Sequence, residues 1–116
     1  MGKTPDPRVE RLLRLLGLGF RARQVVIGVD QVRAELKAGR VACVVVAADV
    51  SPRAAEKVVR LAVGKGVPLL PGPSAEAIGA RLGRQGIMVA GVLDRALAQG
   101  LAEAAPGQRP TGGVSG

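Results

Sequence analysis

The stretch VACVVVAA, residues 41–48, is apolar at every position and rich in β-branched valine. A strand with one face in water alternates polar and apolar residues, so an unbroken apolar run predicts a central strand that is covered on both faces. Ser51 and Pro52 follow after a short gap, and serine as N-cap with proline in the first turn is typical of a helix start. The stretch therefore predicts a buried strand that leads into a helix.

The chain alternates in the same way on both sides of this stretch. Segments with apolar residues at helical spacing are separated by short runs rich in valine and isoleucine. Helices are expected at residues 8–18, at 29–38, from 51 to the glycines at 64 and 66, from Ser74 onward and at 94–103, and strands at 24–27, 41–48, 67–70 and 87–92. This order predicts an α/β fold, a three-layer α/β/α sandwich with a four-stranded mixed sheet.

The chain has the length of one domain. Its 116 residues are enough for one core and too few for two, and we expect a single domain at residues 8–104. Residues 1–7 hold little to bury, so we expect them to be flexible, with Asp6 or Pro7 opening the first helix. The tail, residues 105–116, contains PGQRPTGGVSG and is expected to be disordered because glycine, proline and serine cannot build a core.

The charge balance favours a polyanionic partner. Lysine and arginine number 17 against 9 acidic residues, for a formal net charge of +8 and a sequence pI of about 11.3. The alternative is that arginine only solubilises a small apolar protein, and composition alone does not separate the two. No apolar run approaches membrane-span length and the start of the chain lacks the apolar core of a signal peptide, so we expect a cytoplasmic protein that does not enter a membrane.

The missing residue types exclude several kinds of site. The chain has no histidine and a single cysteine, Cys43, which rules out a His/Cys metal site, a catalytic imidazole and an intramolecular disulfide. Cys43 falls inside the apolar run, where it is expected to act as a small buried residue rather than as a nucleophile. We therefore expect neither an enzyme nor a bound cofactor or metal.

Two glycines imitate a nucleotide-binding loop. Gly17, Gly19 and Ala22 fit the spacing G-x-G-x-x-A, which marks a dinucleotide site when the glycines follow a strand and open a helix. Here they follow a predicted helix and precede a predicted strand, so the order is reversed. We expect Gly17 and Gly19 to end the first helix.

The strand-to-helix order that a phosphate site needs occurs further along, at Gly28. There QVVIG leads directly into VDQVRAEL, so the amides of the first helical turn, from Val29 onward, are available to an anion. Asp30, Gln31 and Arg33 surround this helix start. Asp30 could accept hydrogen bonds from guanine or could stabilise its own helix start, and physical chemistry leaves both open.

Two further cations, Arg21 and Arg23, lie just upstream of this junction. We expect them on the same edge of the fold as Gly28, where they would bind phosphates.

At this point the chain resembles the ribosomal protein family named after L-seven-Ae, which includes kink-turn RNA-binding proteins and the bacterial YlxQ-like proteins. The resemblance runs from about Leu12 to Leu101. It rests on GVDQVRAEL at 28–36, VVVAADVSP at 44–52, VP at 67–68 and AIGARLG at 77–83. The fold that it implies is an α/β/α sandwich.

The resemblance also implies an RNA site. The family pattern G-x-N-E-x-x-K would begin at Gly28, with Asp30, Gln31 and Ala34 in place of its asparagine, glutamate and lysine, and with Arg33 as a cation one residue early. The start of the third helix, at Ser51, and the loop after the fourth helix would complete the site. That loop is Arg84, Gln85 and Gly86, where the family often holds an apolar residue.

These features predict a small non-catalytic protein that docks on structured RNA, either kink-turn-like or ribosomal, with ribosomal or translation-factor proteins as further candidate partners. It would recognise shape and charge, because one aromatic residue cannot build a stacking platform. Two alternatives stay open. A protein-interaction module would show an exposed apolar patch near Gly28 in place of arginine. An accessory domain of an RNA-modifying system would have a modifying enzyme as its partner.

Overall fold

The computed structural model describes residues 6–105, and in these residues five helices alternate with four strands as the sequence predicts. The elements are α1 (Pro7–Arg21), β1 (Val25–Ile27), α2 (Val29–Lys37), β2 (Cys43–Val46), α3 (Pro52–Gly64), β3 (Leu69–Pro71), α4 (Ala75–Leu82), β4 (Val89–Val92) and α5 (Arg95–Ala104). Asp6 caps α1, and Ala105 is buried. The expectations for the two ends otherwise lie outside the described residues.

The four strands form one mixed sheet in the order β1-β4-β2-β3. β4 is antiparallel to both β1 and β2, and β2 is parallel to β3. The carboxyl ends of β1, β2 and β3 and the amino end of β4 therefore share one end of the sheet, which we call the Gly28 end. The opposite end, where β4 leads to Leu93, is called the Leu93 end.

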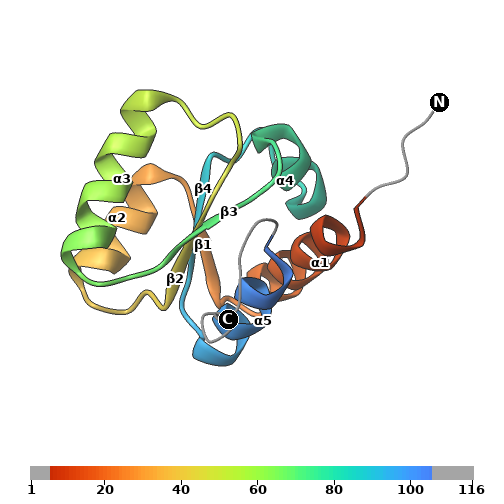
Figure 1. The fold of residues 1–116 in the computed structure, drawn as a ribbon, viewed down its shortest axis with the longest axis horizontal. Coiled ribbons are helices and arrows are strands. Elements are labelled where there is room, and N and C mark those ends of the chain that lie inside the picture. The colour runs from red at the N-terminus through yellow and green to blue at the C-terminus, as the bar shows by residue number, and fades with distance from the viewer. Residues whose placement is uncertain (1–5, 106–116) are drawn as a thin grey trace, which may run out of the picture.

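Helices cover both faces of the sheet, which confirms the predicted three-layer sandwich. In Figure 1, α2 and α3 lie on one face, and α1, α4 and α5 lie on the other. β2 contributes to both layers, because Cys43 and Val45 belong to the core under α1, α4 and α5 while Val44 belongs to the core under α2 and α3. The unbroken apolar run at 41–48 thus contains a central strand, as expected.

The expectation that Gly17 and Gly19 end the first helix is wrong. α1 continues through both glycines to Arg21, and the amide of Ala22 still donates to the carbonyl of Leu18 at 3.0 Å. Gly19 is instead required for packing, since a Cβ there would lie 2.8 Å from Cγ2 of Val25 and closer still to Leu97. Gly17 has room, because its nearest neighbour would be Cγ of Arg81 at 3.6 Å.

The two glycines are therefore expected to respond in opposite directions to the same substitution. Gly17→Ala should raise the free energy of unfolding by about 0.5–1 kcal/mol, because alanine restricts the unfolded chain and favours the helix. Gly19→Ala should lower it by about 1–3 kcal/mol, because the added methyl group overpacks the core. Urea denaturation of the two variants measures both changes, and equal stability of the pair would contradict the packing role of Gly19.

Candidate nucleic-acid interface

Gly28 joins β1 to α2 in a conformation that favours glycine. Its φ is +92° and its ψ is 151°, a backbone conformation that residues with a side chain rarely adopt. Its amide donates to the carbonyl of Val89 at 3.1 Å, which ties the junction to β4. A Cβ at Gly28 would meet nothing within 4 Å, so the residue is needed for its backbone angles and the space beside it is open.

The start of α2 differs from the other helix starts of the described residues. Asp6, Ser51, Ser74 and Asp94 each accept a backbone amide at the beginning of α1, α3, α4 and α5, whereas no side chain caps α2. The first-turn amides of α2, from Val29 on, therefore have no side-chain acceptor. Asp30 and Gln31 are exposed on this turn. The partial positive charge of the helix start is open to solvent.

The segment between β2 and α3 lies beside this junction. The amide of Ala47 donates to the carbonyl of Met88 at 2.8 Å, and the amide of Ala48 donates to the carbonyl of Pro73 at 2.9 Å. An Oδ1 atom of Asp49 accepts the amide of Ala75 at 2.7 Å and ties the segment to the start of α4. Sequence patterns do not single out Asp49, because one aspartate after a strand is common in loops of every kind.

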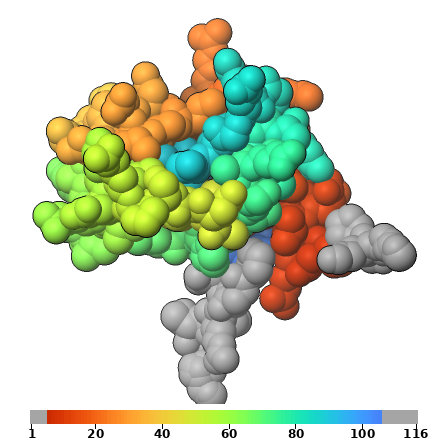
Figure 2. Space-filling model, turned by 90° about the horizontal axis from the view of Figure 1, so that it is seen from above, coloured from red at the N-terminus to blue at the C-terminus, as the bar shows by residue number. Residues whose placement is uncertain are grey.

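Ser51 was expected to belong to the RNA site, and the structure gives its hydroxyl a structural task. Its Oγ accepts the amide of Ala54 at 3.2 Å and caps α3. The residue is half-buried at the Gly28 end of the sheet. Figure 2 shows this end face on, with the orange segment at the start of α2, the yellow segment before α3 and the cyan segment after α4 next to one another.

The loop after α4 places Arg84, Gln85 and Gly86 on the surface. Gly79 holds the loop against α4, because a Cβ there would lie 2.9 Å from the carbonyl oxygen of Arg84, and the Arg84 amide donates to Gly79 at 2.8 Å. The Arg84 guanidinium lies 5.3 Å from the ring centroid of Phe20, within the range of a cation–π contact. The loop therefore reaches the end of α1 and presents a cation there.

Arg21 and Arg23 are not gathered around Gly28 as expected. They precede β1, whereas Gly28 follows it, and the three-residue strand alone spans about 10 Å. Arg23 has a φ of 62°, in the left-handed region, and both arginines are exposed. They lie next in the chain to Phe20, the residue whose ring Arg84 contacts.

Arg33 lies in a groove between α2 and α3. The groove has a volume of about 690 Å³, and we call it the α2–α3 groove. Its lining residues are Arg33, Arg53, Glu56, Lys57, Arg60, Leu61, Gly64 and Lys65. Arg33 is half-buried, and its Nε is a buried nitrogen without a hydrogen-bond partner. The sequence predicted Arg33 beside Asp30 and Gln31 at the start of α2, and the structure places its side chain in the α2–α3 groove.

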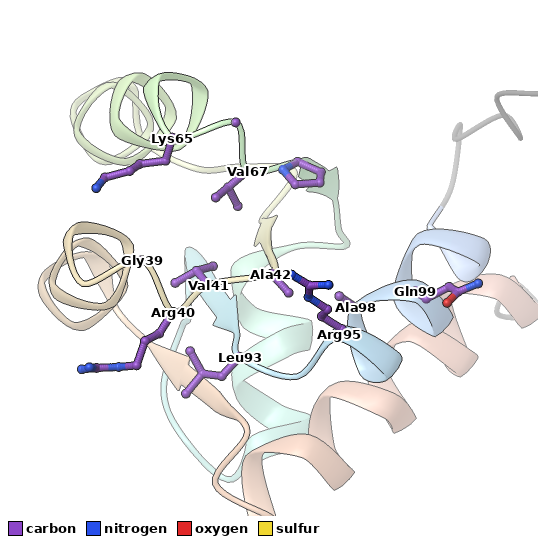
Figure 3. Close-up of a pocket in the computed structure, with 12 residues that line it drawn as sticks. Gly39, Arg40, Val41, Ala42, Lys65, Val67, Leu93, Arg95, Ala98 and Gln99 are labelled. Atoms are coloured by element: carbon purple, nitrogen blue, oxygen red, sulfur yellow. The ribbon is translucent and has the colours of Figure 1, made fainter.

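A second hollow, of about 790 Å³, lies at the Leu93 end of the sheet. Figure 3 shows Arg40 and Lys65 on one side of it and Arg95 on the other. Nε of Arg40 donates to a carboxylate oxygen of Glu35 at 2.7 Å, and this bond raises the pKa of Arg40. Nζ of Lys65 donates to the carbonyl of Lys37 at 3.4 Å. Two of the three cations are therefore already engaged within the protein.

Comparison with known proteins gives the family. The sequence profile of the Ribosomal protein L7Ae/L30e/S12e/Gadd45 family matches residues 10–100. The chain belongs to this family. The family includes proteins that bind kink-turn RNA.

Two solved structures resemble this member of the L7Ae/L30e/S12e/Gadd45 family. A protein with unknown function from Bacillus halodurans C is 28% identical, with a TM-score of 0.76, over 81% of this chain and 95% of the other. The Giardia lamblia 15.5kD RNA binding protein is 25% identical, with a TM-score of 0.66, over 86% of this chain and 93% of the other. A comparison with curated protein sequences finds no match.

The family pattern expected at Gly28 can now be placed in space. Asp30 and Gln31, in the positions of asparagine and glutamate, are exposed on the first turn of α2. Ala34, in the position of the lysine, is exposed further along the same helix. The surface therefore presents the two polar side chains to a ligand, and their contacts with RNA stay a prediction.

The described residues hold no cluster of potential metal ligands, and Cys43 is buried. They contain no group of three or more histidine, cysteine, aspartate or glutamate side chains that could hold a metal ion. No helix among them is long and apolar enough to cross a membrane. Cys43 is 2% exposed, and burial raises the pKa of its thiol to about 12. A thiol in this state is a poor nucleophile at neutral pH, because only the thiolate attacks.

Cys43 should accordingly report on unfolding. At about pH 8 a thiol reagent is expected to label the native protein far more slowly than free cysteine, because the thiol is both buried and protonated. In guanidinium chloride the same residue should react at the rate of an ordinary thiol. With an aromatic disulfide as the reagent, the absorbance of the aromatic thiol that it releases follows both reactions. Prompt labelling of the native protein would contradict the buried position of Cys43.

Proposed function

We propose that this protein is a small non-catalytic RNA-binding protein, of the YlxQ-like branch of its family, that docks on structured RNA through the Gly28 end of its sheet. The observation that carries the proposal is the uncapped start of α2, which opens onto free space beside Gly28. Support comes from the family and from the likeness to an RNA-binding protein of Giardia lamblia. A kink-turn-like or ribosomal RNA in the cytoplasm is the proposed partner, alongside ribosomal or translation-factor proteins.

The amides and side chains at this end have separate tasks. The first-turn amides of α2 would bind phosphate oxygens, which the helix dipole favours. Gln31 and Asp30 would contact base edges, since glutamine both donates and accepts while aspartate accepts from guanine. Arg84 and the more distant Arg21 and Arg23 would bind phosphates and contribute the salt-dependent part of the affinity.

A protein-interaction module is the first alternative, and the exposed side chains do not favour it. The large exposed apolar residues of the described chain are Leu18, Val63 and Met88, and they lie on α1, on α3 and before β4. Single apolar residues on separate elements are common on soluble proteins, whereas docking surfaces are contiguous. The accessory-domain alternative predicts a complex with an RNA-modifying enzyme, which co-purification would reveal.

Binding to RNA tests the proposal directly. The protein would be titrated into labelled kink-turn, hairpin and plain duplex RNAs over a range of salt concentrations. We expect dissociation constants below about 10 μM at low salt, because non-specific electrostatic association alone reaches this range. The kinked RNA should bind most tightly. Equal affinity for all three RNAs would reject the preference for kinked RNA, but the protein would still be an RNA-binding protein. If none of the RNAs binds, the proposal is rejected.

Gln31 offers a sharper test with a matched control. Gln31→Ala should weaken binding to the preferred RNA by about fivefold or more, because a good polar base contact is worth about 1–3 kcal/mol. Gln99→Ala removes another exposed helical glutamine, but at the Leu93 end, and should leave the affinity unchanged. Both substitutions favour helix, so a stability loss would not confuse the comparison. If the two variants bind alike, Gln31 makes no base contact.

A further inference from the structure

We infer that the α2–α3 groove is a second RNA-binding surface, which holds the phosphate backbone of the RNA where it continues beyond the Gly28 end. The inference rests on the proposed function and adds a path for the RNA. α2 and α3 both begin at the Gly28 end, because each follows a strand that ends there. The groove between them therefore begins where the first interface stops.

A hydrogen bond links the two helices at the end of the groove far from Gly28. Nζ of Lys65, just after α3, donates to the carbonyl of Lys37, the last residue of α2. α3 has 13 residues, which at 1.5 Å per residue is a length of about 20 Å. The groove is thus long enough to follow several nucleotides away from Gly28.

The cations of α3 form a stripe on the groove side. Arg53, Lys57 and Arg60 line the groove and are spaced by four and three residues, which places them on one face of the helix. Cations spaced in this way recur about every 5.4 Å, once per turn. This spacing is comparable with that of successive phosphates along a strand. A regular row of phosphates fits such a stripe better than a single compact anion does.

The charges of the groove are poorly compensated by the protein itself. Five of its lining residues are cationic and one, Glu56, is acidic. A carboxylate oxygen of Glu56 lies 3.6 Å from a guanidinium nitrogen of Arg60. Among the described residues, Arg33, Arg53 and Lys57 have no carboxylate within ion-pair distance, as is also true of Arg14 and Arg95, whereas Arg11, Arg40 and Arg81 each have a glutamate. The groove therefore concentrates positive charge that an anionic backbone would neutralise.

Arg33 points to an acceptor that comes from outside the chain. Its Nε is buried in the described structure without a hydrogen-bond partner. A buried donor without an acceptor is costly, and few native structures tolerate one without a compensating role. After a rotation of the side chain that brings its guanidinium nitrogens to the groove surface, which Arg33 lines, a phosphate oxygen would supply the acceptor. Leu61 and Gly64 complete the lining without adding charge, so a sugar–phosphate chain can lie between the two helices.

Neutralising two of these cations tests the inference. Arg53→Gln with Lys57→Gln removes two charges from the groove. On a kinked RNA with long flanking duplexes, we expect the slope of log affinity against log salt to fall in magnitude by about 1.4–1.8, because each phosphate contact contributes about 0.7–0.9. The affinity at about 0.1 M salt should fall by about 25- to 60-fold, because this slope change acts over one decade of salt below 1 M. On an RNA trimmed to the kink, the double variant should bind like the unaltered protein.

The matched control is Arg14→Gln with Arg95→Gln. These two arginines are also exposed, lie on α1 and α5, and carry the same total charge. The control pair should change the salt slope by less than half as much. Equal effects of the two pairs on the long RNA would overturn the inference while leaving the proposed function intact. Absence of all RNA binding by the unaltered protein would overturn both.

Arg33→Met provides a second readout. Methionine keeps the apolar stem and removes the buried Nε, so the free protein should show a higher midpoint of thermal unfolding. Binding to the long RNA should nevertheless weaken, by about as much as for one lost phosphate contact. Unchanged binding would show that Arg33 makes no phosphate contact and would overturn the inference. Capture of an acidic peptide by the groove, with no effect of Arg33→Met on RNA, would assign the groove to a protein partner and reject the inference.

Discussion

β4 pairs antiparallel with β1 on one side and with β2 on the other, and all four of its residues are buried. This double pairing brings the carboxyl ends of β1 and β2 to the amino end of β4. Because β3 runs parallel to β2, the starts of α2, α3 and α4 and the loop after α4 meet at one end of the sheet. A Cβ at Gly91 would lie 3.2 Å from Cγ2 of Val26 on β1, which is tighter than an ordinary contact, and 3.5 Å from Cγ2 of Val32 on α2.

Most of the acidic residues are used to build this framework, whereas most arginines of the described residues form no ion pair. Among the nine carboxylates, those of Asp6, Asp49 and Asp94 accept backbone amides at helix starts, and those of Glu10, Glu35, Glu56 and Glu103 form ion pairs with arginine. The hydrogen bond from Arg81 lowers the pKa of Glu10, the contact that links α1 to α4. The remaining two, Asp30 and Glu76, lie in the first turns of α2 and α4.

The positive surface is therefore a consequence of where the acids are used. The groove between α2 and α3 has one glutamate for five cations, and on the other layer two of the six cations of α1, α4 and α5, Arg11 and Arg81, form ion pairs with glutamate. A partner with a row of negative charges would gain most from the groove, because uncompensated cations lose no internal ion pair when they bind it. The Gly28 end and the groove would then form one continuous RNA surface.

Local sequence patterns determined the helix and strand order, the serine caps of α3 and α4 and the central position of β2, because periodicity and capping involve residues a few positions apart. They also identified Gly28 as a strand-to-helix junction. Strand ends were overestimated, since Val41, Ala47 and Ile87 are buried without belonging to a strand, and an apolar run reports burial rather than pairing. Tertiary structure alone decided that Gly19 packs against Val25 and Leu97, that Arg23 lies at the other end of β1 from Gly28, and that Arg33 enters the α2–α3 groove. Each of these depends on which distant elements become neighbours, and that is set by strand order and helix packing rather than by the residues next to them in the chain.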